Sequence, residues 1–175
     1  MADTVSAEQR SRNMSRIRSK NTKPELKVRR LLHRAGYRFR LHGAAAGGAL
    51  PGKPDLVFAG RRKVIFVNGC FWHTHSCPAG THAPATNPEF WAAKRARTVA
   101  RDAAALQSLE DSGWEALVVW ECELRDPGAV ESGLLAFLGP PGKPVSVFEK
   151  ELAERAASLD SSDTLHPTRG NYSDD

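Results

Sequence analysis

Residues 55–67 read DLVFAGRRKVIFV, and this stretch decides the fold of the chain. Its two apolar runs, 55–59 and 63–67, are rich in the β-branched and aromatic residues that favour strands. The triplet Gly60-Arg61-Arg62 between them is typical of a tight connection between neighbouring strands. We therefore predict an antiparallel hairpin over these residues.

Helices and further strands are expected on both sides of this hairpin. Asn21 or Thr22 as an N-cap, with Pro24 in the first turn, predicts a helix that ends near Gly36. The other predicted elements are strands at 37–42 and 115–121, helices at 88–110, 128–138 and near 147–158, and loops at 43–54 and 68–87. This order predicts an α/β fold in which helices flank a mixed central sheet.

Length and composition limit the class of protein. With 175 residues, the chain is long enough for one domain with a hydrophobic core and too short for two ordinary domains. It has no apolar run near the roughly 18 residues of a membrane helix, and its first residues do not resemble a signal peptide. Three cysteines without an export signal make a disulfide framework improbable. We expect a cytoplasmic protein that does not contact a membrane.

Charge is distributed unevenly along the chain. Residues 1–40 hold 12 basic and 3 acidic side chains, whereas residues 141–175 hold 4 basic and 7 acidic ones. A basic arm next to a nearly neutral body indicates binding to a polyanion, most simply nucleic acid, although a solvated helix face is the alternative. We predict a basic DNA-contacting arm at 1–20, a domain at 21–139, and an extension at 140–175 that is partly helical and then mobile.

All three cysteines could contribute to one metal site. Cys70 and Cys77 lie close together in a stretch that also contains His73 and His75, and Cys122 follows the predicted strand 115–121. Zinc in structural sites prefers thiolate and imidazole ligands in a closed tetrahedron. The spacing is not that of a zinc finger, so three unrelated buried thiols are the alternative. Spacing also does not decide which of the two histidines would bind the metal.

Two further features could serve nucleic-acid chemistry. Asp55 follows Gly52-Lys53-Pro54 at the start of an apolar strand, where a carboxylate needs a partner such as a metal ion. Taken alone, however, an ordinary turn aspartate is the simpler interpretation of Asp55. Phe71-Trp72 lie inside the Cys/His loop, where aromatic rings either cover the sheet or act as wedges between bases.

Several uncommon motifs, taken together, resemble one known family. They are Val64 to Cys77 (VIFVNGCFWHTHSC), Gly52-Lys53-Pro54-Asp55, Val119-Trp120-Glu121-Cys122, Arg12-Asn13-Met14-Ser15 and Glu89-Phe90-Trp91. In order and spacing, they resemble the bacterial very short patch repair (Vsr) DNA mismatch endonucleases over roughly residues 9 to 125. The resemblance implies a restriction-endonuclease-like fold. It also implies an Mg²⁺-dependent enzyme that nicks one DNA strand 5′ of the thymine in a T:G mismatch, initiating repair of deaminated 5-methylcytosine.

The same resemblance implies roles for individual residues. Asp55 and the main-chain carbonyl of Val67 would bind Mg²⁺. His73 would be the general base, oriented by Asp102, and Glu25 would support the water shell of the metal. Cys70, His75, Cys77 and Cys122 would hold a structural Zn²⁺. Residues implied to contact DNA are Phe71, Trp72 and Trp91 as wedges on the major-groove side, Met14 from the opposite groove, and Lys94 near the mismatched pair.

Two positions depart from the pattern of the best-known members of the family. Val67 replaces a usual threonine, and its carbonyl still offers a metal ligand. Asn68 replaces a frequent histidine. Asparagine can hydrogen-bond a phosphate but cannot act as a cation, so the departure affects the leaving-group side of the mechanism.

Two other functions remain as alternatives to a T:G mismatch nickase. One is a related endonuclease with another DNA substrate, for restriction or modification-dependent cutting. The other is a catalytically inert zinc DNA-binding module. For the leading interpretation we expect a monomer that acts on double-stranded DNA at the bacterial nucleoid and contacts mismatch-repair proteins.

Overall fold

The computed structural model describes residues 9, 12, 20–45 and 48–142. The chain divides into two compact units, 1–142 and 143–175, and all elements described below belong to the first. Met14 and the helix expected near 147–158 lie outside the described residues. The division into an arm at 1–20, a domain at 21–139 and an extension at 140–175 stays a prediction.

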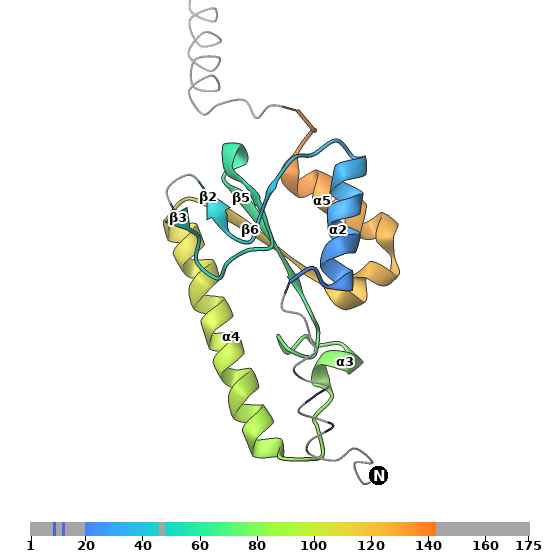
Figure 1. Ribbon diagram of the computed structural model, residues 1–175, viewed down its shortest axis with the longest axis vertical. Helices are drawn as coiled ribbons and strands as arrows, with labels where there is room; N and C mark the ends of the chain where they lie inside the picture. Colours follow the sequence, from blue (N-terminus) through green and yellow to red (C-terminus); the bar gives the residue numbers. More distant parts are fainter. Residues whose placement is uncertain (1–8, 10–11, 13–19, 46–47, 143–175) are drawn as a thin grey trace, which may run out of the picture. The chain divides into compact units, whose positions relative to one another are not determined.

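A four-stranded mixed sheet forms the centre of the described structure (Figure 1). Strands β4 (Leu56–Phe58) and β5 (Lys63–Asn68) pair antiparallel, which confirms the predicted hairpin. Strand β6 (Glu115–Trp120) runs parallel to β5, and β1 (Arg40–Leu41) pairs antiparallel with β4, so the order is β1-β4-β5-β6. The predicted mixed sheet with helices packed on it is therefore confirmed.

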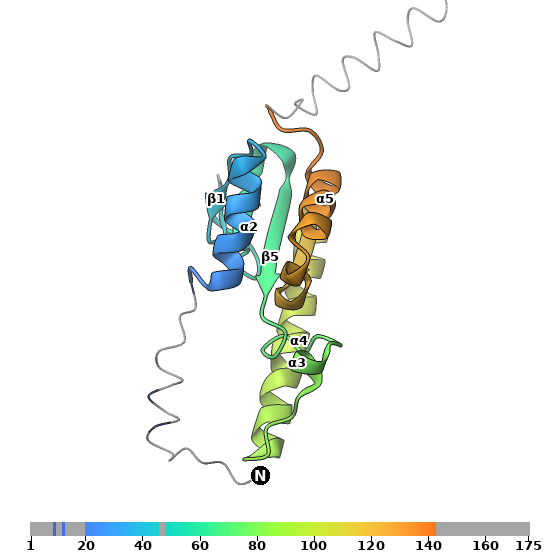
Figure 2. The ribbon, with the colours of Figure 1, turned by 90° about the vertical axis from the view of Figure 1, so that its right-hand side faces the viewer.

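Alternation along the strands gives the sheet two apolar faces. In β5, Ile65 and Val67 pack with helices α2 (Lys23–Arg34) and α5 (Pro127–Leu138), which lie side by side on one face in Figure 2. Val64 packs on the other face with Leu109 of helix α4 (Pro88–Asp111). The long crossover from β5 to β6 therefore places α4 on the opposite face of the sheet from α2 and α5 (Figure 1).

Helix α2 begins and ends as its sequence predicts. Thr22 is the N-cap, and its hydroxyl oxygen accepts a hydrogen bond from the Glu25 amide at 3.4 Å. At the other end, the amides of Gly36 and Tyr37 donate to the carbonyls of His33 and Leu32 at 3.1 and 2.9 Å. This Schellman pattern requires the left-handed φ of +87° that Gly36 adopts.

The connections between the main elements differ from the predictions. The strand expected at 37–42 is shorter in the structure and consists of β1 alone, because β4 spans only three residues and offers few pairing partners. Leu41 is exposed rather than packed with Tyr37 and Phe39. The loop expected at 43–54 contains a small hairpin of β2 (Ala44–Ala45) and β3 (Gly48–Ala49). Two short helices were also missed: α3 (Pro78–Thr81) in the predicted loop 68–87, and the 3-10 helix η2 (Glu121–Arg125).

The hairpin connection also fastens both flanking helices. It consists of the 3-10 helix η1 (Ala59–Arg61) and Arg62, which adopts a left-handed φ of 52°. The Arg61 guanidinium donates to the carbonyls of Leu138, the last residue of α5, and of Pro140, just after it, each at 2.7 Å. Arg62 donates to the carbonyl of Gly113 at 2.9 Å, just after α4. Two arginines therefore satisfy carbonyls that a helix end leaves without partners.

Arg61→Met should lower the free energy of unfolding by about 1–2 kcal/mol, because it removes charge-assisted hydrogen bonds at the end of α5. Urea denaturation measures the change. Arg30→Met is the matched control, because Arg30 is exposed on α2, and it should change stability by less than about 0.5 kcal/mol. Equal stabilities of the two variants would contradict the role of Arg61.

No helix within the described residues combines the length and the apolar character that crossing a membrane requires.

Candidate functional site

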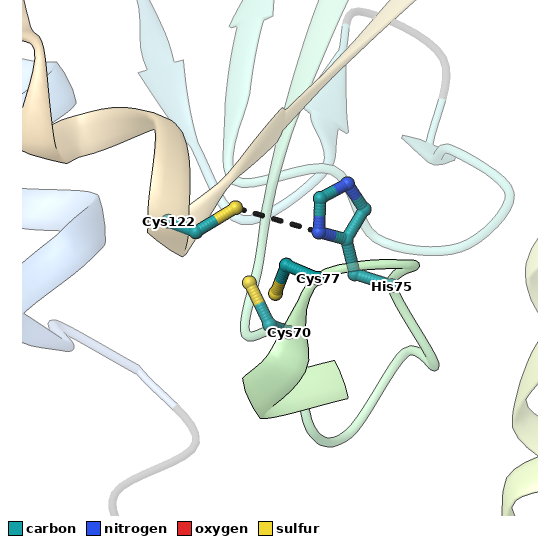
Figure 3. Close-up of side chains that lie close together, drawn as sticks. All are labelled: Cys70, His75, Cys77 and Cys122. Atoms are coloured by element: carbon teal, nitrogen blue, oxygen red, sulfur yellow. Dashed lines mark hydrogen bonds between the residues drawn. The ribbon is translucent and has the colours of Figure 1, made fainter. Parts of the chain in front are cut away.

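Four side chains that could hold a metal ion meet at the end of the sheet (Figure 3). The Sγ atoms of Cys70, Cys77 and Cys122 and a ring nitrogen of His75 all lie within 4.8 Å of one another. His75 Nδ1 is 3.4 Å from Cys122 Sγ. The cluster decides between the two histidines in favour of His75, and it excludes three scattered thiols.

Strand register explains why two distant cysteines meet. Asn68 and Trp120 are paired in the parallel ladder of β5 and β6, and Cys70 and Cys122 each follow two residues later. Parallel strands end at the same edge of a sheet, so both thiols leave it at the same level. Cys122 lies in the first turn of the short helix η2 rather than at the end of β6.

The loop after β5 turns back so that His75 and Cys77 can join this pair. The His75 amide donates to the Cys70 carbonyl at 3.0 Å, and Cys77 is the N-cap of α3. The His75 ring stacks on Trp120 at 4.4 Å between ring centroids. Gly80 approaches so closely that a Cβ there would lie 2.1 Å from the His75 carbonyl oxygen. Glycine is therefore required at this position.

The ionisation of the thiols fits a cation-binding role. Burial raises the pKa of the Cys70 thiol to about 12, whereas the hydrogen bond with His75 lowers the pKa of Cys77 to about 6. Three sulfurs this close cannot all carry a negative charge without a cation between them. Three thiols and one imidazole form a donor set that suits a closed tetrahedral metal site.

Asp55 lies at the other side of the same sheet edge. Its Oδ2 accepts a hydrogen bond from the Val67 amide at 2.7 Å, so the carboxylate is held against the end of β5. Its Oδ1 has no hydrogen bond with any described residue. Burial raises the pKa of Asp55, and the nearby Glu25 carboxylate raises it further, while the Val67 hydrogen bond and the charge of Arg29 oppose the rise. The site therefore favours a cation next to Asp55.

Glu25 is fixed by the start of α2. Its buried carboxylate accepts hydrogen bonds from the Asn21 amide and the Thr22 hydroxyl, both at 2.9 Å, and from Arg29 at 2.8 Å. Thr22 in turn caps the Glu25 amide, so the two residues form a reciprocal capping arrangement. The cap thus holds a second carboxylate beside Asp55.

His73 lies against Asp102, the residue that the resemblance implies would orient it. His73 Nδ1 lies 2.5 Å from Asp102 Oδ2, and both side chains are about a quarter exposed. The His73 amide donates to the Gly69 carbonyl at 3.2 Å, and Asp102 lies on α4. In the tautomer that carries the proton on Nδ1, the Asp102 carboxylate accepts a hydrogen bond from Nδ1–H, and Nε2 is the ring nitrogen left as an acceptor.

Four aromatic rings gather where the loop after β5 meets the start of α4. Phe71 contacts Trp72 and Trp91 with centroid separations of 5.0 and 5.5 Å, and Phe90 contacts Trp91 at 5.5 Å. Lys94 Nζ lies 5.1 Å from the Trp91 ring centroid and 5.4 Å from that of Trp72. We call these five residues the aromatic cluster.

Most of the predicted site residues come together, but not all can be placed. Asn68 ends β5, half-buried between Val67 and the Cys/His loop, and Met14 lies outside the described residues. The sequence analysis missed Phe90, which is 55% exposed in the aromatic cluster, as a site residue. It also missed Arg95, whose contacts are described below. The i,i+4 spacing between Phe90 and Lys94 on α4 could have identified Phe90.

Comparisons with known proteins identify the family of the chain. Residues 2–79 match the family model "DNA mismatch endonuclease Vsr". The chain is 48% identical to "Type II nicking enzyme V.XorIIP" of Xanthomonas oryzae pv. oryzae, over 80% of this chain and 99% of that protein. It is 42% identical to "DNA mismatch endonuclease Vsr" of Escherichia coli K12, over 71% of this chain and 77% of that protein. The solved catalytic domain of homing endonuclease I-Bth0305I shows a TM-score of 0.44 at 21% identity, covering 67% of this chain and 94% of that domain.

The mixed sheet, the carboxylates at its edge and these relatives define the chain as a DNA endonuclease. It belongs to the DNA mismatch endonuclease Vsr family.

Proposed function

We propose that this chain is an Mg²⁺-dependent nickase of restriction-endonuclease-like fold that cuts one DNA strand 5′ of the thymine in a T:G mismatch. The observation that carries the proposal is that two acid–base groups are fixed at one end of β5. Asp55 is bonded to the Val67 amide, and His73, whose amide is bonded to Gly69, pairs with Asp102. The names of the relatives, a mismatch endonuclease and nicking enzymes, support the substrate and the single-strand cut.

Asp55 and the carbonyl of Val67 would hold Mg²⁺. In a strand, the amide and carbonyl of one residue point to the same side, so the Val67 carbonyl faces the side on which its amide meets Asp55. Both donors are the hard oxygens that Mg²⁺ prefers, and Glu25 adds negative charge nearby. When bound, Mg²⁺ neutralises phosphate charge and makes water a better nucleophile.

His73 would act as the general base. With Nδ1–H donated to Asp102, Nε2 faces the reaction as the acceptor and takes the proton of the attacking water. Asp102 fixes this tautomer and stabilises the imidazolium that forms. Asn68 would hydrogen-bond the scissile phosphate as a neutral donor. Because Asn68 adds no positive charge, Mg²⁺ and His73 would provide most of the electrostatic stabilisation of the reacting phosphate.

The aromatic cluster would recognise the mismatch by unstacking it. A wobble pair stacks weakly, so rings inserted beside it cost less than rings inserted into paired DNA. Phe71, Trp72 and Trp91 are the proposed wedges, and Lys94 would contact the mismatched pair. Zn²⁺ bound by Cys70, His75, Cys77 and Cys122 would brace the loop that carries the first two rings. Met14 and the basic arm at 1–20 would approach from the opposite groove.

The test is a nicking assay on one end-labelled duplex in four versions: T:G mismatch, C:G pair, T:A pair and A:C mismatch. We expect a single-strand nick 5′ of the thymine only in the T:G duplex, and only with Mg²⁺ present. Cutting of fully paired DNA, or of both strands, would favour a restriction or modification-dependent endonuclease. Tight binding without any Mg²⁺-dependent cutting would select an inert DNA-binding module.

Asp102→Asn should reduce the single-turnover nicking rate by about 100-fold, because an amide no longer enforces the tautomer with a free Nε2. Thermal stability should change little, since the amide can still hydrogen-bond Nδ1. Glu110→Gln is the matched control, because it removes an exposed carboxylate from the same helix and should keep the wild-type rate. A wild-type rate for Asp102→Asn would remove Asp102 from the mechanism.

A further inference from the structure

Arg95 connects helix α4 to the loop that carries the Cys/His cluster. Its Nε donates to the Thr74 hydroxyl at 3.2 Å, and its Nη1 donates to the His82 carbonyl at 3.0 Å. Its Nη2 donates to the carbonyl of Gly80 in α3. Its guanidinium carbon also lies 5.5 Å from the centroid of the Phe71 ring. One side chain thus contacts four points along residues 71–82.

This loop has little apolar packing of its own. Among residues 69–87, only Cys70 and Gly80 are buried. The helix α3 has four residues, too few to be stable alone. The metal-binding residues fix the side of the loop next to β5 and β6, and Arg95 contacts the side that faces α4. The loop is therefore fastened at two places.

The contacts of Arg95 also distinguish it from an ordinary DNA-binding cation. All three guanidinium nitrogens donate to acceptors within the protein, so none is left wholly for a phosphate. Arg97 lies on the same helix, is exposed, and has no side-chain hydrogen bond or ion pair with any described residue, which makes it a suitable arginine for comparison. A role as a positive charge for DNA phosphates therefore does not explain the contacts that Arg95 makes within the protein.

We propose that Arg95 is a positioning residue that holds residues 71–82 against α4 and so keeps the Phe71 ring in contact with the Trp91 ring. The planar guanidinium is suited to this role, because it presents several donors in fixed directions, whereas an ammonium is a point charge. The consequence for DNA cutting rests on the function proposed above. The hold on the loop itself does not depend on that function.

The first measurement concerns the free protein with its metal bound. We compare amide hydrogen exchange in wild type, Arg95→Met, Arg95→Lys and the control Arg97→Met. The Gly80 and Thr81 amides, which donate to the Cys77 carbonyl at 2.9 Å, should exchange at least about tenfold faster in both Arg95 variants and unchanged in Arg97→Met. Metal content should stay at one ion per chain in all four proteins. Unchanged exchange in Arg95→Met would overturn the proposal.

The second measurement is single-turnover nicking of the T:G duplex. Both Arg95 variants should lose about 10- to 100-fold in rate with a nearly unchanged dissociation constant, because the rings are misplaced rather than absent. Full activity of Arg95→Lys would overturn the positioning role in favour of a simple charge contact. If wild type fails to nick, the proposed function is wrong, and the exchange measurement still decides the role of Arg95.

Discussion

Asp55→Asn is expected to abolish nicking of the T:G duplex, with a loss of at least about 10³-fold in rate, the several kcal/mol that a catalytic metal supplies. Asp55 is the half-buried carboxylate held against the end of β5, and it is the one ionised side chain proposed to bind Mg²⁺. An amide is a weak ligand for a hard cation and carries no charge. The measurement is the nicking rate as a function of Mg²⁺ concentration.

Asp55→Asn should leave the fold intact, so a loss of nicking can be attributed to lost catalysis rather than to unfolding. The Asn side-chain oxygen can still accept the hydrogen bond from the Val67 amide. Because burial disfavours the ionised carboxylate, the melting temperature without Mg²⁺ should be unchanged or higher. Asp111→Asn, at the exposed end of α4, is the control and should nick like wild type. Asp55→Asn with more than a tenth of the wild-type rate would refute the metal-binding role.

The second large effect is expected at Cys122, where serine should cost the protein its structural metal and at least about 3 kcal/mol of stability. The loop between β5 and α4 buries few side chains, so a bound metal would replace the core that this region lacks. Cys122 is the one ligand that comes from η2, and without it the loop is no longer joined to the end of β6. Metal analysis and thermal unfolding measure the two effects.

A chelator provides the internal check on this prediction. Removing the metal from wild type should lower its melting temperature to that of Cys122→Ser, whereas the variant should not respond. Ser76→Ala is the matched control, because Ser76 is exposed between two of the ligands and should leave metal content unchanged. Full metal occupancy in Cys122→Ser would show that the four side chains do not form the site.

Elements with strong local signals were predicted correctly. The apolar runs around Gly60-Arg61-Arg62 formed the hairpin, and Pro88 began a long helix, because side-chain pattern and backbone preference agree there. Strand β1 was predicted too long, because alternation shows which residues suit a strand but not how many partners the neighbouring strand offers. Helix η2 was missed because it follows β6 without a turn signal.

The site was less accessible to sequence reasoning than the fold. Spacing alone left His73 and His75 equivalent, and only the fold separates them, by placing one beside Asp102 and the other beside Cys122. Family resemblance suggested this division, whereas composition did not. Arg95 had no clear signal, because two of its three acceptors are backbone carbonyls, which every residue type possesses.

The equal offset of Cys70 and Cys122 from the paired residues Asn68 and Trp120 has a consequence for folding. If β6 slipped by one residue along β5, Cys122 would move by about 3.3 Å and its strand would turn the opposite side chains to each face. The four ligands would then no longer converge. If these four side chains bind a metal ion as proposed, only a chain with the correct strand register could bind it, so metal binding would select that register.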